Sequence, residues 1–501
     1  MSTVKKFAGE TAIYGLSTVI SRTLNFFLTP ILAGALPAKV YGIFTKMYSY
    51  ASILNAIIAF GMETTFFRYL NKHPENKSKI YSNSFLAIAG MAFAFFLATI
   101  FFADPIAQWI RSGKTETVAD YSFYVKCFIY ILIADAFCVI PFAKLRADGK
   151  PKRYALIKFL NVLLVVSLNL VFLFAIPYII KHNLAGASWM ASWYKFHWVG
   201  YVFFANLIAS ILTLLLLLPE ILQLKLQFDW EIFKQMLAYS APVLIANISF
   251  IINENIDKLM LGWLLPPNIS DQEVGIYGAC AKIALFLSIF IQAFRLGAEP
   301  FFFSHAKNKN SGQTYARIMD YFIIAICLIF VGVIANIELL KYFIRASDPV
   351  QRQIYWSGLG VVPLLLFGYV SLGIYMNLSV WYKLSDQTKY GLYISGVGAI
   401  LTIVLNFIFI PKYSYMASAW VSLIAYATMM VLSYVWGQKN YPIPYDLKKN
   451  FAYIISSMIF VYLSFYVFHR NIFIGNALLL IFGVAALSFE WKGLKAIFIK
   501  G

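Results

Sequence analysis

The amino-acid sequence predicts an all-α polytopic membrane protein with about 14 transmembrane helices, arranged as two parallel-repeat six-helix bundles followed by two C-terminal helices. The chain is 61% hydrophobic and only 13% charged, whereas globular chains carry roughly 45–50% and about 25% of such residues. Its mean hydropathy is +0.73. A span needs about 20 apolar residues, so 14 spans would occupy roughly 280 of the 501 positions and leave no room for a large soluble domain.

Apolar runs between polar stretches give the bounds of the individual spans, with an expected error of about two to four residues at each end. The predicted spans are 10–34, 42–68, 81–103, 121–144, 153–177, 197–219, 236–264, 275–303, 316–344, 354–380, 389–410, 415–436, 450–468 and 472–490.

The formal net charge of +19 is read as orientation rather than as a sign of nucleic-acid binding. Lys and Arg at the span ends gather mainly on the side that holds both termini, and basic loops usually face the cytoplasm. We therefore expect both termini in the cytoplasm. The N-terminal apolar run contains Arg22 and lacks the features of a signal peptide, so we expect the first span to stay in the mature protein.

Several features argue against an enzyme. The four cysteines lie in apolar runs without CxxC spacing, which predicts neither disulfides nor a metal cluster. The sequence has no phosphate-binding GxxxxGK loop, no HExxH pair and no plausible nucleophile triad. The longest external segments, 104–120 and 178–196, are too short for the acceptor chemistry of a membrane polymerase or ligase. We expect no cofactor.

Short segments repeat along the chain, which is typical of a duplicated transporter fold. Glu63 matches Glu299 at an offset of 236 residues, and Asn169 matches Asn406 at an offset of 237. The matching segments are 41–44 with 274–277, 61–67 with 297–303, and 168–172 with 405–409.

The repeat predicts the domain organisation. Each half holds six spans, an even number, so both halves have the same orientation and a site between them is expected near the bilayer midplane. The predicted domains are a first bundle at 1–219, a cytoplasmic linker at 220–235, a second bundle at 236–440, and two further spans with a tail at 441–501.

Charged residues inside spans are candidates for function, because each costs at least about 2.5–3.5 kcal/mol to insert. In the first span Arg22 and Asn25 share a helix face, which favours a cavity position. In the eighth span Gln292, Arg295 and Glu299 form a second stripe. Arg295 and Glu299 are also i, i+4 neighbours, so mutual neutralisation is an equal alternative.

The remaining intramembrane charges are more ambiguous. Glu254 and Lys258 in the seventh span can neutralise each other, and a structural role is favoured for Asp135 and Lys282. Candidate ligands for a coupling proton or sodium ion are Glu63, Asp135, Glu254 and Glu299. Cations and anions are equal in number, but Arg22 and Lys282 have no obvious local partner, which favours an anionic substrate. The groups counted are Arg22, Lys126, Lys258, Lys282 and Arg295 against Glu63, Asp135, Glu254, Asp257 and Glu299.

The sequence resembles the Wzx-type polysaccharide flippases of the multidrug/oligosaccharidyl-lipid/polysaccharide (MOP) exporter superfamily over nearly its whole length. The resemblance is carried by Arg22 ahead of Pro30, followed by soft motifs rather than strict signatures. These motifs are VYGIF at 40–44, GMETTFFRYL at 61–70, NENIDKLMLG at 253–262 and FRLGAEPFFF at 294–303.

The resemblance implies a flippase that moves undecaprenyl-diphosphate-linked oligosaccharides across the bacterial cytoplasmic (inner) membrane for O-antigen, lipopolysaccharide, capsule or exopolysaccharide assembly. It also implies a cationic cavity between two bundles. The polysaccharide polymerase machinery would be a further partner, and nucleic acid would not. The predicted substrate contacts are Arg22, Asn25, Arg295, Gln292, Lys282 and Lys258.

Two related functions stay open at this point. A multidrug MATE exporter would be expected to have acidic residues in the first bundle and commonly 12 spans, in contrast with Arg22 and the two additional spans here. A lipid II flippase shares fourteen spans and a cationic cavity, so only the motifs favour an oligosaccharide cargo. The sequence does not choose between a proton and a sodium gradient as the energy source.

Overall fold

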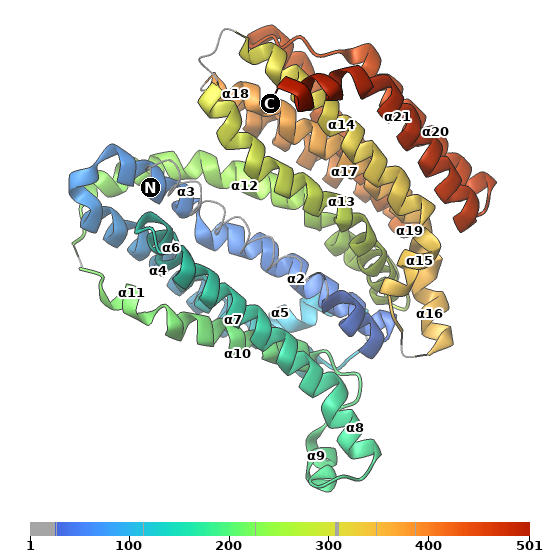
Figure 1. Cartoon of the computed structure of the whole chain (residues 1–501). Helices are drawn as coiled ribbons and strands as arrows, with labels where there is room; N and C mark the ends of the chain where they lie inside the picture. Colours follow the sequence, from blue (N-terminus) through green and yellow to red (C-terminus); the bar gives the residue numbers. More distant parts are fainter. Residues whose placement is uncertain are drawn as a thin grey trace. The chain divides into compact units, whose positions relative to one another are not determined.

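The secondary structure is helical, as the sequence predicts (Figure 1). A computed structural model describes residues 26, 28–113, 115–225, 227–305, 310–346, 348–385 and 387–500, without the side chains of 296, 299, 300, 303–305, 492–494 and 496–500. These ranges contain no strand.

The helices of the first part of the chain are α2 (Ala38–Ala59), α3 (Met62–Lys72), η1 (Pro74–Asn76), α4 (Lys77–Ile100), α5 (Ala103–Ile110), α6 (Val118–Ala147), α7 (Pro151–Leu170), η2 (Val171–Ala175), α8 (Ile176–Lys181), α9 (Ala187–Trp193), α10 (Gly200–Leu216), α11 (Leu218–Leu222) and α12 (Trp230–Leu264). They are followed by α13 (Ser270–His305), α14 (Ser311–Ala335), α15 (Ile337–Leu340), η3 (Lys341–Phe343), α16 (Pro349–Trp356), η4 (Ser357–Gly360), α17 (Val361–Leu378), α18 (Val380–Leu384), α19 (Lys389–Asn440), α20 (Leu447–Tyr462), η5 (Leu463–Val467) and α21 (Ile472–Lys500).

Eleven helical stretches in the described part of the chain are long and apolar enough to cross a membrane. The predicted spans 389–410 and 415–436 both lie in α19, which Ser414 divides with non-helical angles (φ 49, ψ −139). Predicted span 197–219 corresponds to the shorter helix α10. Predicted span 10–34 lies mostly outside the described residues, so the multi-pass fold is confirmed while the total of fourteen stays a prediction.

The chain forms two compact units. The first contains residues 1–278, 346–354 and 402–415, and the second contains 279–345, 355–401 and 416–501. Helices α13 and α19 contribute to both units. The four predicted sequence domains are defined by the repeat rather than by compactness, and they stay a prediction.

Helix α6 is the central helix of the first unit and packs against α4, α5 and α10. It begins with a capping box in which the Thr117 hydroxyl accepts from the backbone N–H of Asp120, and the Asp120 carboxylate accepts from the backbone N–H of Thr117. This arrangement satisfies two backbone donors that a helix start leaves open. Tyr121 and Tyr124 of the first two turns are fully buried.

The start of α12 is fastened to α4 in the same unit. Asp229 caps α12 by accepting from the backbone N–H of Ile232 at 3.2 Å. The same carboxylate pairs with Lys79 at 3.0 Å, and Asn83 donates to the backbone carbonyl oxygen of Asp229 at 2.8 Å. The end of the predicted linker 220–235 therefore has a fixed position against α4.

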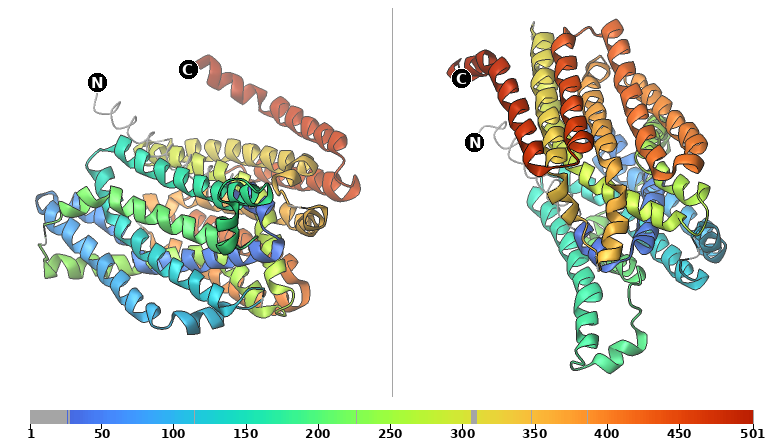
Figure 2. Two further views of the ribbon diagram at one scale, coloured as in Figure 1. Left: turned by 90° about the horizontal axis from the view of Figure 1, so that it is seen from below. Right: turned by 90° about the vertical axis from the view of Figure 1, so that its right-hand side faces the viewer.

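Helix α7 continues through the π-turn η2 into α8 and projects beyond its neighbour α10 (Figures 1 and 2). The 31 residues from Pro151 to Lys181 correspond to about 46 Å of helix, against a hydrocarbon core of about 30 Å. The projecting α8 and α9 carry the exposed rings of Tyr178, Trp189 and Trp193. Such rings suit the membrane interface.

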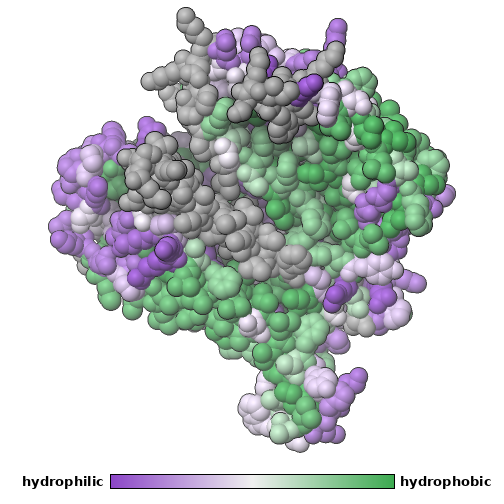
Figure 3. Space-filling view, in the orientation of Figure 1, coloured by the Kyte–Doolittle hydropathy of each residue, from purple (hydrophilic) through white to green (hydrophobic). Residues whose placement is uncertain are grey.

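In the second unit, α14 packs against α17, α20 and α21. Side chains of α20 and α21 expose a broad apolar surface, seen as the green area over these helices in Figure 3. In water such a surface would be a liability, but in a membrane span it is the side that meets lipid.

Two of the matching sequence segments contact each other in the first unit. A Cβ atom on Gly42 of α2 would overlap the backbone carbonyl of Asp271, and a Cβ on Gly275 of α13 would overlap that of Ala38. Each glycine thus touches the residue four positions before the other, which is the reciprocity of a local two-fold contact. The absence of side chains lets the two backbones approach.

Replacing Gly275 with Val should separate α2 from α13 and lower the thermal stability of the purified protein, because overpacking of a tight contact costs about 1–3 kcal/mol or more. The control is Gly90→Ala on α4, where a Cβ atom meets nothing within 4 Å. Equal melting temperatures for the two variants would contradict the close contact.

Candidate functional site

Three predicted site residues lie where the structure gives no side-chain position. Arg22 and Asn25 fall outside the described residues, and for Glu299 only the helical backbone in α13 is described. Their predicted roles are therefore untested by the geometry.

Arg295 and Asn377 come together in the second unit. Arg295 on α13 and Asn377 on α17 line one small cavity, with Phe294, Phe322 and Met376 around them. The Nε of Arg295 and the Nδ2 of Asn377 are both buried, and neither has a hydrogen-bond partner. Both unpartnered atoms are donors. An anionic oxygen is the group that would satisfy them.

The close approach of α13 and α17 places these two side chains. Gly373, one turn before Asn377, lies so near Ile291, one turn before Arg295, that a Cβ atom would be 2.9 Å from the Ile291 Cδ1 atom. The cavity measures about 10 Å³, which is room for about one water molecule. A larger anion would require α13 and α17 to move apart.

Gln292 and Lys282 also lie on α13 and are half-buried. Gln292 is one turn from Arg295 and belongs to the same stretch of helix. Lys282 is thirteen residues away, which corresponds to about 20 Å along the helix axis. The structure therefore does not bring Lys282 to Arg295.

Lys258 has its ion-pair partner on its own helix. Its ammonium lies 3.1 Å from Asp257 and also donates to the backbone carbonyl oxygen of Glu254. Asp257 is buried and accepts from the Tyr277 hydroxyl at 2.6 Å. This neutralised Lys258–Asp257–Tyr277 group joins α12 to α13 and has the character of a structural contact.

Asp135 and Glu63 both have partners in the first unit. Asp135 on α6 hydrogen-bonds to Ser210 of α10. Glu63 on α3 forms an ion pair with Arg146 near the end of α6. The Glu63 carboxylate is 49% exposed, so a proton or ion could reach it.

A buried ion pair that the sequence analysis did not single out connects three elements of the first unit. Lys46 of α2 and Asp271 of α13 pair with only 2% of each side chain exposed. The Lys46 ammonium also contacts the Ser112 hydroxyl, and the Thr115 hydroxyl donates to Asp271 at 2.7 Å. Gly113 leaves the space for the Asp271 carboxylate, which a Cβ atom would overlap.

Glu116 lies beside this pair, in the loop before α6. The pKa of its carboxyl is raised to about 7, mainly by burial. The hydrogen bond from Tyr124 lowers this pKa, whereas the negative charges of Asp120 and Asp271 raise it. Lys195 lowers the pKa of Glu116 by a smaller amount. The carboxyl therefore changes its charge near neutral pH.

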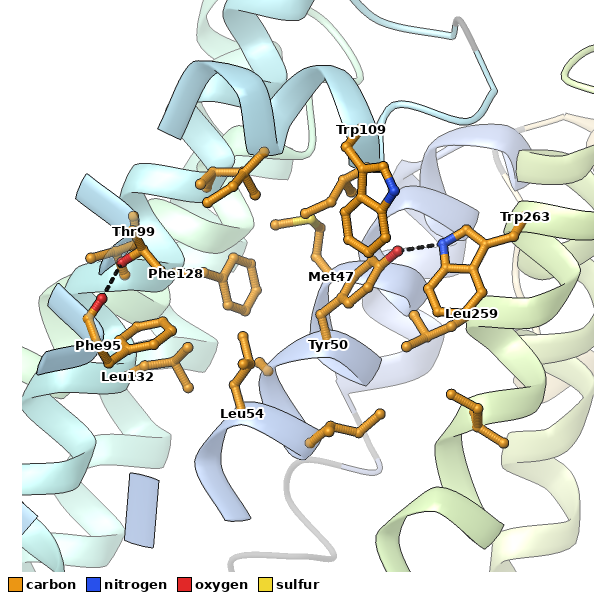
Figure 4. Close-up of a pocket in the computed structure, with 17 residues that line it drawn as sticks. Met47, Tyr50, Leu54, Phe95, Thr99, Trp109, Phe128, Leu132, Leu259 and Trp263 are labelled. Atoms are coloured by element: carbon orange, nitrogen blue, oxygen red, sulfur yellow. Dashed lines mark hydrogen bonds between the residues drawn. The ribbon is translucent and has the colours of Figure 1, made fainter. Parts of the chain in front are cut away.

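An apolar cavity of about 440 Å³ lies in the first unit, lined by α2, α4, α5, α6 and α12 (Figure 4). Two polar groups of its wall have internal partners: Thr99 donates to the Phe95 carbonyl oxygen, and the Trp263 indole donates to the Tyr50 hydroxyl, both at 2.7 Å. Trp109 and Trp263 stand at one end with ring centroids 5.8 Å apart. This wall suits a hydrocarbon chain rather than a sugar or a phosphate.

The family model "Polysaccharide biosynthesis protein" matches residues 7–303, which is more than half of the chain. The chain belongs to the polysaccharide biosynthesis protein family. A second model, MatE, matches residues 242–408. No curated protein matches this family member significantly in sequence.

Solved structures share the fold of this polysaccharide biosynthesis protein at low sequence identity. The lipid II flippase MurJ in an inward closed conformation has a TM-score of 0.72 and 15% identity, over 96% of this chain and 99% of that one. An inward-facing multidrug resistance MATE family transporter of the MOP superfamily has a TM-score of 0.65 and 16% identity, over 85% of this chain and 97% of that one. A MOP superfamily transporter from Pyrococcus furiosus has a TM-score of 0.52 and 14% identity, over 86% of this chain and 95% of that one.

These findings confirm the predicted resemblance to MOP superfamily flippases, and the apolar helices of the described part of the chain agree with a multi-pass membrane protein. The matched structures are described as a flippase and as transporters. The described residues contain no group of three or more His, Cys, Asp or Glu side chains able to hold a metal ion.

The sequence analysis missed Lys46, Asp271 and Asn377. Lys46 lies inside predicted span 42–68, so the cost of a charge in a span was a usable signal. Asp271 precedes predicted span 275–303, and Asn377 is an uncharged side chain near a span end. Nothing in the local pattern distinguished these two from ordinary interfacial residues.

Replacing Asp271 with Asn leaves the buried Lys46 ammonium without its counter-ion and should destabilise the protein by about 3–5 kcal/mol. The double variant Lys46→Met with Asp271→Leu should recover much of the lost melting temperature. Lys79→Gln, which removes a partly exposed ion pair, is the control and should cost about 1 kcal/mol or less. A similar small loss for Asp271→Asn would show that the pair is not shielded from water.

Glu116 should make the folded protein less stable as the pH rises. Its folded pKa of about 7 lies above the ordinary value of 4.5, so its stabilising contribution is complete below about pH 4.5 and is lost as the pH rises through about 7. The measurement is the melting temperature between about pH 5 and about pH 8. Glu116→Gln should flatten this dependence, whereas Glu231→Gln at an exposed position beside Lys234 should leave it unchanged.

Proposed function

We propose that this protein is a flippase for an undecaprenyl-diphosphate-linked oligosaccharide in the bacterial cytoplasmic membrane. It moves the lipid-linked glycan from the cytoplasmic to the outer leaflet by alternating access, for O-antigen, capsule or exopolysaccharide assembly, with both termini in the cytoplasm. Membership of the polysaccharide biosynthesis protein family supports a glycan pathway.

The observation that carries the proposal is the pair of buried donors without acceptors, Arg295 and Asn377. A guanidinium with an amide beside it favours a phosphate oxygen, because Arg presents N–H groups in a fork that matches phosphate. Among the described residues that line this cavity, none has a carboxylate that could pair with a cationic drug. The donor pair therefore favours an anionic cargo over the cation cargo of a multidrug exporter.

The apolar cavity of the first unit supports the lipid part of the cargo, because most of its lining side chains are apolar and two of its polar groups are hydrogen-bonded within the wall (Figure 4). The further proposed substrate contacts are Arg22, Asn25, Gln292, Lys282 and Lys258. A proton or sodium ion would couple transport through Glu63, Asp135, Glu254 or Glu299, and the exposed Glu63 is the most accessible of those whose side chains are described.

Lipid II is the second candidate cargo. It is favoured by the structural similarity to the lipid II flippase MurJ, which extends over 99% of that chain. Both cargoes carry a polyprenyl diphosphate, so the same donor pair would serve either.

Mass spectrometry of lipid-linked intermediates in a strain that lacks the gene tests the proposal. Accumulation of a polyprenyl-diphosphate oligosaccharide would support the proposed function and identify the glycan. Accumulation of the same lipid with a disaccharide-pentapeptide would assign lipid II. Unchanged lipid intermediates together with hypersensitivity to cationic drugs would replace the proposal by a multidrug exporter.

Arg295→Gln should reduce transport at least about tenfold, because one charge-assisted hydrogen bond contributes about 1.5–3 kcal/mol. Asn377→Asp should reduce transport similarly, because the new carboxylate would form an ion pair with the Arg295 guanidinium. The measurement is complementation of the deletion strain at matched membrane levels of protein. Lys439→Gln, an exposed cation of the same unit, is the control. Wild-type transport by both site variants would remove the donor pair from the mechanism.

A further inference from the structure

A second cavity in the second unit is polar and has a different charge. It measures about 510 Å³ and lies where α14, the segment 441–446, α20 and α21 meet. Its charged lining residues are Arg317, Asp320, Asp446, Lys449 and Glu490. Three carboxylates against two cations give a net negative charge. A negatively charged cavity is unusual on this side of the membrane, where the sequence places most of its Lys and Arg.

Part of this charge is already paired within the protein. The Lys449 ammonium lies 2.8 Å from Glu490 and 3.7 Å from Asp320. Tyr453 donates to the other oxygen of Glu490 at 3.2 Å. Lys449 is therefore engaged, and it has little capacity left for an anionic ligand.

Three groups of the cavity have atoms that these contacts leave unsatisfied. The Oδ1 atom of Asp320 is buried and has no hydrogen-bond partner. Asp446 caps α20 through one oxygen, which accepts from the backbone N–H of Lys449 at 3.1 Å. Arg317 on α14 is exposed, and no ion pair involves it within the described part of the chain. The cavity thus offers acceptors for a donor cation beside a guanidinium for an anion.

An apolar groove continues from this cavity. It measures about 380 Å³, lies between α20 and α21, and shares Lys449 and Glu490 with the polar cavity. Phe460, Phe482 and Phe489 line its wall. Phe460 is eleven positions beyond Lys449, which corresponds to about 16 Å of helix, close to half of the hydrocarbon thickness of about 30 Å. The groove therefore has the depth of one leaflet.

We propose that this cavity and groove bind a zwitterionic phospholipid with a primary-amine headgroup. The ammonium donates to Asp320 and Asp446, the phosphate lies against Arg317, and one acyl chain occupies the groove between α20 and α21. Charge complementarity identifies the headgroup: an anionic lipid would add charge to a net negative cavity, and a choline headgroup has no N–H to donate. The bound lipid would join α14 to the two C-terminal helices.

The experiment uses the purified full-length protein in detergent and three phospholipids with identical acyl chains. The headgroups are ethanolamine, choline and glycerol, and the readouts are the melting temperature and the lipids retained in native mass spectrometry. We expect ethanolamine lipid to raise the melting temperature most and to be retained most. Equal effects of the three lipids, or a preference for the anionic glycerol lipid, would overturn the proposal.

Variants separate headgroup recognition from general lipid binding. Asp446→Asn keeps a residue able to cap α20 while removing the charge, and Arg317→Gln removes the proposed phosphate contact. Asp446→Asn should weaken the retention of ethanolamine lipid about tenfold and leave choline lipid unaffected, whereas Arg317→Gln should weaken the retention of both lipids, because both headgroups carry the phosphate. Glu231→Gln, an exposed acid on α12, is the control. Unchanged retention of ethanolamine lipid in both site variants would overturn the assignment of the headgroup site.

Discussion

The first unit depends on the buried ion pair between Lys46 and Asp271. Neither charge is tolerable alone in an apolar interior, so each helix is stable in this position only with the other beside it. The contact of Gly42 with the backbone near Gly275 brings α2 and α13 close enough for the pair to form. Through Ser112 and Thr115, the pair also holds the segment between α5 and α6.

The two units contain sites of different polarity. The first contains a cavity with a mostly apolar wall, which suits hydrocarbon. The second contains buried donors at Arg295 and Asn377 and a separate acidic cavity near Lys449. The proposed amphiphilic cargo would need apolar and polar contacts together, and residues of different helices provide them in this chain.

The helical fold was predictable because hydropathy and span length follow directly from the composition of each segment. Thirteen of the fourteen predicted spans fall on described helices. Two of them share α19, and its break at Ser414 lies in the gap that the sequence leaves between the predicted spans 389–410 and 415–436. The site was less predictable. Arg295 was found because a charge in a span is costly, whereas its partner Asn377 is uncharged and belongs to a helix distant in sequence. The role of Arg22 stays a prediction.

The reciprocal contact of Gly42 and Gly275 has a consequence for how such a chain can evolve. The two positions descend from one ancestral position if the halves arose by duplication, and each now limits the volume available at the other. A larger residue in one half can be accepted only if the opposite backbone withdraws, so drift in the two halves is coupled at this point. The internal symmetry should therefore persist longest where the copies touch, even as their cavities diverge.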